Sequence, residues 1–105
     1  MAKHTCYRVQ PVGQELGQHR SETSNGELDR GVHVFGCLSA LGGGVRGWCN
    51  PGWQPEVVAI ECDLADLRDN GDYEGFVLVG NRGIIVERIT FPTWEALLDW
   101  AKTVE

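Results

Sequence analysis

The sequence predicts an α+β fold, with a mixed or antiparallel sheet of about five strands covered by a C-terminal amphipathic helix. Several short runs alternate apolar and polar residues with the period of two that is typical of strands. Clusters of Gly, Pro, Asn and Asp separate these runs. The last run instead repeats apolar residues with helical spacing. The 105 residues fit one compact domain over 1–105.

The alternating runs give the strands and their faces. We expect strands over residues 6–10, 31–35, 56–62, 74–79 and 84–91. In the third of these, Val58, Ile60 and Cys62 share one face, because successive strand residues point to opposite sides. The Gly-Asn-Arg-Gly segment at 80–83 tolerates positive φ, so the last two strands are predicted to form a hairpin.

The clearest helix is expected over 93–104, with Thr93 as its N-cap. Its apolar stripe consists of Trp94, Leu97, Leu98, Ala101 and Val104. Such a stripe must pack on another element. A second helix begins near Leu38, but the three glycines at 42–44 are expected to end or fray it. Each helical glycine costs about 1 kcal/mol relative to alanine.

Two long loops are the expected contact surfaces. Residues 13–30 are polar and glycine-rich, and a loop longer than about 12–15 residues in a compact domain is usually functional or mobile. Residues 42–55 carry Trp48 and Trp53 among glycines and prolines. Tryptophan is enriched among interface hot spots, so both are candidate partner-binding residues. The alternative is that they fold back as a lid on the core.

The charge balance narrows the classes of partner. The chain has 15 acidic and 9 basic residues, a net charge of −6. This disfavours nonspecific binding to nucleic acid or anionic membranes, and it suits either a basic protein partner or solubility alone. No apolar signal segment and no run of about 18 apolar residues is visible, so we expect a cytoplasmic protein. The sequence also lacks nucleophile-elbow, zinc-protease and phosphate-loop motifs.

The four cysteines are expected to be reduced thiols in or near the core. They are Cys6, Cys37, Cys49 and Cys62. A cytoplasmic chain normally keeps its thiols reduced. His4 and Cys6 could bind a metal together, but no C-x-x-C pair supplies the remaining ligands. We therefore predict no metal site.

Three polar residues on predicted strands are candidates for a catalytic site. Arg8 carries a planar guanidinium that suits phosphate or carboxylate recognition, and the alternative is a surface arginine. His33 lies between two valines, where a structural histidine is the more common case. Strict alternation places Glu87 on the apolar face of its strand, where a carboxylate would lose hydration as functional carboxylates do. The alternatives for Glu87 are an exposed sheet face or an ion pair with Arg8.

The order of the elements resembles a reduced ADP-ribosyltransferase-like fold. The resemblance is carried by Tyr-Arg-Val at 7–9, Gly-Val-His-Val-Phe at 31–35 and Val-Val-Ala-Ile-Glu at 57–61. It implies NAD as a cofactor, with Arg8 on the dinucleotide phosphate or ribose and His33 lining the cleft. It also implies that Glu87 takes the place of the glutamate that stabilises the oxocarbenium-like ribose. The compact, acidic character also resembles small accessory proteins of actinobacterial phages.

Two functions therefore compete. The first is a small acidic interaction or accessory protein that needs no cofactor and binds a protein partner through loops 13–30 and 42–55. The alternative is an NAD-dependent ADP-ribosyltransferase-like enzyme. The enzyme requires Arg8, His33 and Glu87 to converge on one cleft, whereas the interaction protein requires an exposed apolar patch.

Overall fold

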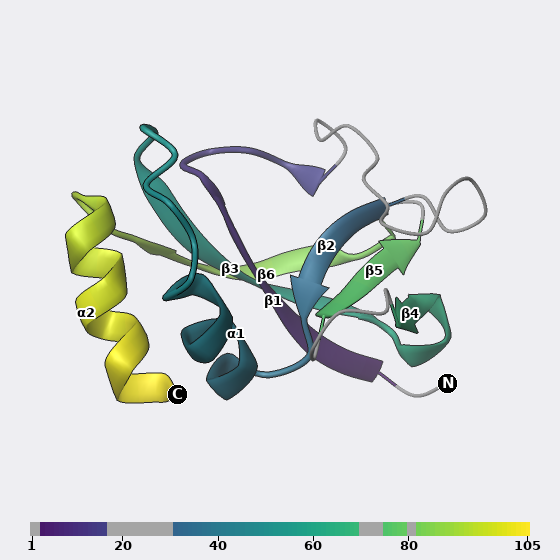
Figure 1. The fold of residues 1–105 in the computed structure, drawn as a ribbon. Helices are drawn as coiled ribbons and strands as arrows, with labels where there is room; N and C mark the ends of the chain where they lie inside the picture. Colours follow the sequence, from purple (N-terminus) through teal and green to yellow (C-terminus); the bar gives the residue numbers. More distant parts are fainter. Residues whose placement is uncertain (1–2, 17–30, 70–74, 80–81) are drawn as a thin grey trace.

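The computed structural model describes residues 3–16, 31–69, 75–79 and 82–105 (Figure 1). In chain order the elements are β1 (Lys3–Pro11), β2 (Gly31–Phe35), α1 (Leu38–Val45), β3 (Pro55–Asp63), the 3₁₀ turn η2 (Leu64–Asp66), β4 (Leu67–Asp69), β5 (Gly75–Val79), β6 (Ile84–Thr90) and α2 (Trp94–Val104). Most of the predicted loop 13–30 lies outside the described residues.

The strands form one antiparallel sheet in the order β4-β5-β2-β1-β3-β6. The predicted α+β class, with a C-terminal helix on an antiparallel sheet, is confirmed. The short β4 was not predicted as a strand, because three residues carry too little alternation to be read. The longest pairing joins β1 to β3, from Lys3 opposite Asp63 to Pro11 opposite Pro55.

The hairpin predicted for the last two strands is wrong. β5 pairs with β2 and β4, while β6 pairs with β3 at the far end of the strand order. Residues 80–83 still join these distant strands, so the ends of β5 and β6 lie within roughly 18 Å, since an extended chain reaches at most about 3.6 Å per residue. A flat sheet would hold these two strands about 19 Å apart, at four spacings of about 4.8 Å. A Cβ at Gly83, next to β6, would lie 3.2 Å from the Leu78 side chain in β5, so the sheet curls about one of its faces.

The curled sheet has a core on each face. The concave side holds a cluster, called here the inner core, that consists of Cys6, Leu16, Val34, Val58, Ile60, Cys62 and Leu78. The other side carries the helix-side core, which consists of Val9, Leu41, Val45, Val57, Phe91, Trp94, Leu97 and Ala101. The two clusters draw alternate residues from β1 and β3, as the period of two requires. The curl also brings Gly83 so close that a Cβ there would lie 2.6 Å from the Ile60 side chain.

Both helices cover the helix-side core, and Figure 1 shows them on the same side of the sheet. The prediction for α2 is confirmed. The Thr93 hydroxyl accepts a hydrogen bond from the Ala96 N–H at 3.1 Å, and Trp94, Leu97 and Ala101 are buried. Within the described part of the chain, neither helix is long and apolar enough to cross a membrane.

Helix α1 contradicts the prediction that the glycine run would end it, because it continues to Val45. A Cβ at Gly42 would lie 2.7 Å from the Ala101 carbonyl oxygen in α2, and one at Gly44 would lie 2.6 Å from the Phe35 ring. These glycines let α1 approach both α2 and β2. Tertiary packing thus overrides the low helix propensity of glycine.

Strand β6 contains a β-bulge that strict alternation could not reveal. Glu87 lies opposite Ala59, but Ile85 lies opposite the next residue, Ile60, so Val86 is the extra residue. A bulge exchanges the faces of the residues that follow it.

The bulge corrects two predicted positions. Ile85 packs against the inner core, whereas Ile89 packs against the helix-side core, so Glu87 does not share a face with Ile85. Strict alternation predicts that Arg88 shares a face with Ile84, but Arg88 lies opposite Val58 and points to the inner face, whereas Ile84 lies opposite Glu61 on the other face.

Candidate functional site

Arg8 is buried on the inner face of β1. Its Nη1 donates a hydrogen bond to the His33 carbonyl oxygen at 2.9 Å. β1 and β2 share the register pair Tyr7–Phe35 and diverge beyond it in Figure 1. The guanidinium therefore bridges the two strands where they separate. Arg8 is not the surface arginine that was the alternative interpretation.

Glu87 lies on the opposite face of the sheet from Arg8. Arg8 and Arg88 both lie opposite Val58, and directly opposed residues in a ladder point to the same side. Glu87 is the neighbour of Arg88 along the strand, so it points the other way, and it is exposed. The structure thus brings Arg8 to the backbone of His33 but does not bring Glu87 to either residue.

Sequence reasoning missed a buried polar cluster around Glu56. This carboxylate is only 1% exposed at the start of β3. Its Oε1 accepts hydrogen bonds from Gln10 Nε2 at 3.0 Å, from the Gly13 N–H at 3.2 Å and from Arg88 Nη1 at 2.5 Å. The signal was present, since Glu56 has the same parity as the inner-core residues of β3, but the sequence analysis assigned no face to this residue.

The cluster around Glu56 fixes the turn that follows β1. Gln10 Nε2 also donates to the Gln14 carbonyl oxygen at 2.8 Å, and Arg88 Nη2 donates to Glu15 at 2.6 Å. Just beyond, Leu16 is buried in the inner core. A buried charge is tolerated only when it is paired and hydrogen-bonded, and Glu56 meets both conditions. The start of the predicted loop 13–30 is therefore held firmly on the sheet.

Cys6 and Cys62 form a buried pair of thiols in the inner core. Their Sγ atoms lie 3.9 Å apart, and both cysteines are reduced. Burial raises the pKa of the Cys6 thiol far above its ordinary value, and burial raises the pKa of Cys62 as well. Such thiols are poor nucleophiles. His4 Nε2 lies 3.0 Å from the Gly36 carbonyl oxygen, and the described residues contain no metal-binding group of three or more His, Cys, Asp or Glu side chains.

The two tryptophans of the second loop have different environments. Trp53 packs against the helix-side core, and its ring meets that of Trp94 edge-on with centroids 6.0 Å apart. Trp48 is 45% exposed and rests on Phe35, again at 6.0 Å. Trp53 therefore folds back on the core as the alternative interpretation proposed, whereas Trp48 presents a large apolar surface to solvent.

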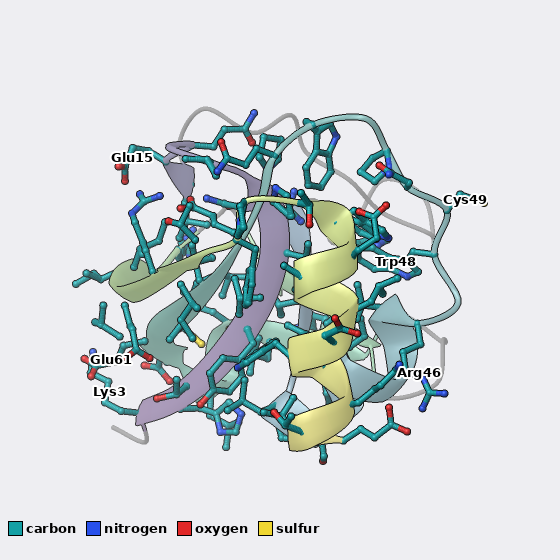
Figure 2. All side chains as sticks on the ribbon, turned by 90° about the vertical axis from the view of Figure 1, so that its left-hand side faces the viewer. Lys3, Glu15, Arg46, Trp48, Cys49 and Glu61 are labelled. Atoms are coloured by element: carbon teal, nitrogen blue, oxygen red, sulfur yellow. The ribbon has the colours of Figure 1, made fainter. Side chains whose placement is uncertain are left out.

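An open depression of about 230 Å³ lies beside this loop. It is lined by Arg46, Glu95, Leu98, Asp99 and Lys102. Figure 2 shows Arg46, Trp48 and Cys49 on the same side of α2. Arg46 forms an ion pair with Glu105, which raises the pKa of the guanidinium through its hydrogen bond and charge. The depression thus has an apolar floor residue, Leu98, and a rim of mixed charge.

No family model, curated protein or solved structure matches this chain. The resemblance to ADP-ribosyltransferase-like proteins therefore stays a prediction from sequence.

Proposed function

We propose that this chain is a protein-binding module whose contact surface is centred on Trp48 and the adjacent depression. The exposure of Trp48 carries the proposal. A tryptophan that is nearly half exposed on a fixed loop offers a partner a large apolar area to bury. Tryptophan is also the residue type most enriched among binding hot spots.

The loop that presents Trp48 is held at both ends. The Trp48 N–H donates to the Val45 carbonyl oxygen at 3.0 Å, which ties its backbone to the end of α1. At the other end, Gln54 Nε2 donates to the Phe91 carbonyl oxygen at 3.0 Å, next to the anchored Trp53 ring. A contact loop that is already ordered loses less conformational entropy on binding, which favours affinity.

The charges around Trp48 suggest the chemistry of the partner. Glu95 and Asp99 line the depression. The Lys102 Nζ lies 3.8 Å from Asp99 Oδ1, and Arg46 forms an ion pair with Glu105. The rim is thus locally neutralised, while the chain as a whole carries −6. A partner with an apolar anchor and a basic surrounding surface fits both features. Loop 13–30 is proposed as a second contact region, with its first turn fixed by the Glu56 cluster.

A photo-crosslinking capture tests the proposal. Cys49 is exposed next to Trp48, so in a Cys37→Ser variant a maleimide–benzophenone probe labels Cys49 while the buried thiols stay unreactive. The probe is irradiated in a lysate of the cells that express the protein. We expect one stoichiometric adduct that Trp48→Ala abolishes.

The control is Leu64→Ala, because Leu64 is similarly exposed at 52% but lies in η2. Both variants should retain the wild-type melting temperature within a few degrees. The proposed surface is rejected if the adduct forms equally well with Trp48→Ala, or if Leu64→Ala removes it to the same extent.

A further inference from the structure

We propose that the open edge of β6 binds an extended peptide strand in which basic and aliphatic residues alternate, and that the strand extends the sheet. This goes beyond the Trp48 surface and does not depend on it. β6 is the terminal strand on one side of the sheet and spans seven residues, from Ile84 to Thr90. An edge strand directs every second N–H and C=O away from the sheet, and these groups can pair with an incoming strand.

The side chains at this edge are unusually apolar for an exposed strand. Ile84 is 65% exposed and Val86 is 56% exposed, the highest values for large hydrophobic residues in the described part of the chain. The helices do not cover them, because α2 packs over the other end of the strand, near Ile89. Ile84 lies on the face of Glu61 and Glu87, so the basic side chains of an added strand would share that face and their methylene stems would cover Ile84.

Two carboxylates flank the exposed isoleucine on the same face. Glu61 lies directly opposite Ile84 on β3, and Glu87 follows in β6 opposite Ala59. Both are exposed, and neither forms an ion pair within the residues that the structure describes. The basic residue of the strand, Arg88, points to the inner face.

Glu61 and Glu87 thus place two carboxylates at this edge. Arg88 does not offset Glu61 and Glu87, because it is engaged by Glu56 and Glu15 on the other side of the sheet. Lys3 lies beside Glu61 in Figure 2 and on the same face of the sheet, but the two form no ion pair in the described structure. Lysine or arginine side chains on an added strand would meet unpaired carboxylates, which gives charge complementarity.

The same charges argue against a second copy of this chain as the occupant. Antiparallel pairing of two β6 strands would place Glu61 and Glu87 on the same face as their counterparts from the other copy. Like charges across a sheet are destabilising. Charges on an edge strand are a known device against self-pairing. A peptide strand with lysine or arginine side chains would instead be attracted to Glu61 and Glu87.

The β6 edge is separate from the Trp48 surface. Trp48 rests on β2, and two strands, β1 and β3, lie between β2 and β6. Figure 2 shows Glu61 and Trp48 on opposite sides of α2. A substitution at one surface therefore leaves the other intact, and the two proposals can fail independently.

The test uses a fluorescein-labelled, C-terminally amidated nonapeptide in which lysine alternates with valine, with binding followed by fluorescence anisotropy. We expect saturable binding that weakens as salt is raised, and amide chemical-shift changes concentrated in β6. The Glu61→Gln/Glu87→Gln variant should bind about two- to thirtyfold more weakly, the combined effect of two exposed charge pairs. Glu15→Gln/Glu105→Gln removes the same number of charges from outside the face that carries Glu61 and Glu87 and should leave the affinity unchanged.

Two altered peptides separate strand addition from simple charge attraction. Glutamate in place of lysine should abolish binding, and proline in place of the central valine should do so too, because proline lacks the N–H that the ladder needs. The proposal is overturned if the proline peptide binds as well as the parent peptide, or if the two double variants lose affinity equally. Absence of binding at about 1 mM peptide, roughly 4 kcal/mol of binding free energy, would overturn it as well.

Discussion

The Glu56 cluster allows a quantitative test of what holds the turn after β1 in place. Replacing Glu56 with alanine removes the acceptor shared by Gln10, Gly13 and Arg88. The Gly13 N–H loses the carboxylate, while Gln10 Nε2 keeps its hydrogen bond to the Gln14 carbonyl oxygen. The Arg88 side chain is 30% exposed and keeps its contact with Glu15, so it can turn towards water.

This geometry sets the size of the effect. Removing one member of a fully buried ion pair typically costs about 3–5 kcal/mol. The exposure of Arg88 lowers that value, while the two lost hydrogen bonds contribute about 0.5–1.5 kcal/mol each. We expect Glu56→Ala to lower the free energy of unfolding by about 2–4 kcal/mol. Glu56→Gln keeps an oxygen for Gln10 and Gly13 and loses only the charge, so it should cost about 1 kcal/mol.

Urea unfolding, followed by the fluorescence of the tryptophans in the helix-side core, measures both values. Glu15→Gln is the matched control, because Glu15 contacts the same arginine from a side chain that is 66% exposed. It should change stability by less than about 0.5–1 kcal/mol. The reasoning is refuted if Glu56→Ala stays within about 0.5 kcal/mol of wild type, or if Glu56→Gln is as damaging as Glu56→Ala.

Three further predictions follow from individual contacts. Gly42→Ala should destabilise the protein by about 1–3 kcal/mol, because the added Cβ meets the α2 backbone. Gly43→Ala has open space around it and should stabilise the protein by about 0.5–1 kcal/mol. Chemical denaturation should therefore show changes of opposite sign for the two variants. Thr93→Ala should lower stability by about 1 kcal/mol through loss of the N-cap, and an unchanged thermal unfolding curve by circular dichroism would contradict this. Burial raises the pKa of both Cys6 and Cys62 in the fold, so the stability that these thiols contribute is complete below the unfolded-state pKa of about 8.5 and declines as the pH rises above it. For Cys6, whose pKa is raised the most, the decline reaches up to about 1.4 kcal/mol per pH unit. Urea unfolding between about pH 7 and 10 should show a shallower decline in a Cys6→Ala/Cys62→Ala variant, and parallel curves would refute the assignment.

The sequence predicted the strands best where one face meets a core. In β3, Val58 and Ile60 face the inner core while Val57 faces the helix-side core, as alternation required. Propensity failed where a distant element decides the outcome. Gly42 weakens an isolated helix, yet it is what allows α1 to lie against α2. The partner of β6 also depends on the curl of the whole sheet, which a local turn signal at 80–83 does not encode.

The candidate site shows the same division. The sequence left open whether Trp48 and Trp53 are exposed or fold back on the core. In the structure Trp53 packs against Trp94, whereas Trp48 is exposed. Glu87 shares a face with Ile89, as alternation predicts, but a single extra residue, Val86, puts Ile85 on the other face. Glu87 is exposed, as one of its alternative interpretations had it. A β-bulge leaves the composition and most of the alternation intact, so one sequence carries little trace of it.

The hydrogen bond that Arg8 makes on the inner face bears on the choice between a protein-binding module and an NAD-dependent enzyme. For Arg8 to hold a dinucleotide phosphate, its guanidinium would have to give up or share the bond to the His33 carbonyl, and that oxygen lies where β1 and β2 separate. Glu87 would have to reach the same ligand from the opposite face of the sheet. Binding at Trp48 requires neither change, because its exposed ring and ordered backbone are in place before a partner arrives. The lower reorganisation cost favours a surface interaction over chemistry at the Arg8, His33 and Glu87 positions.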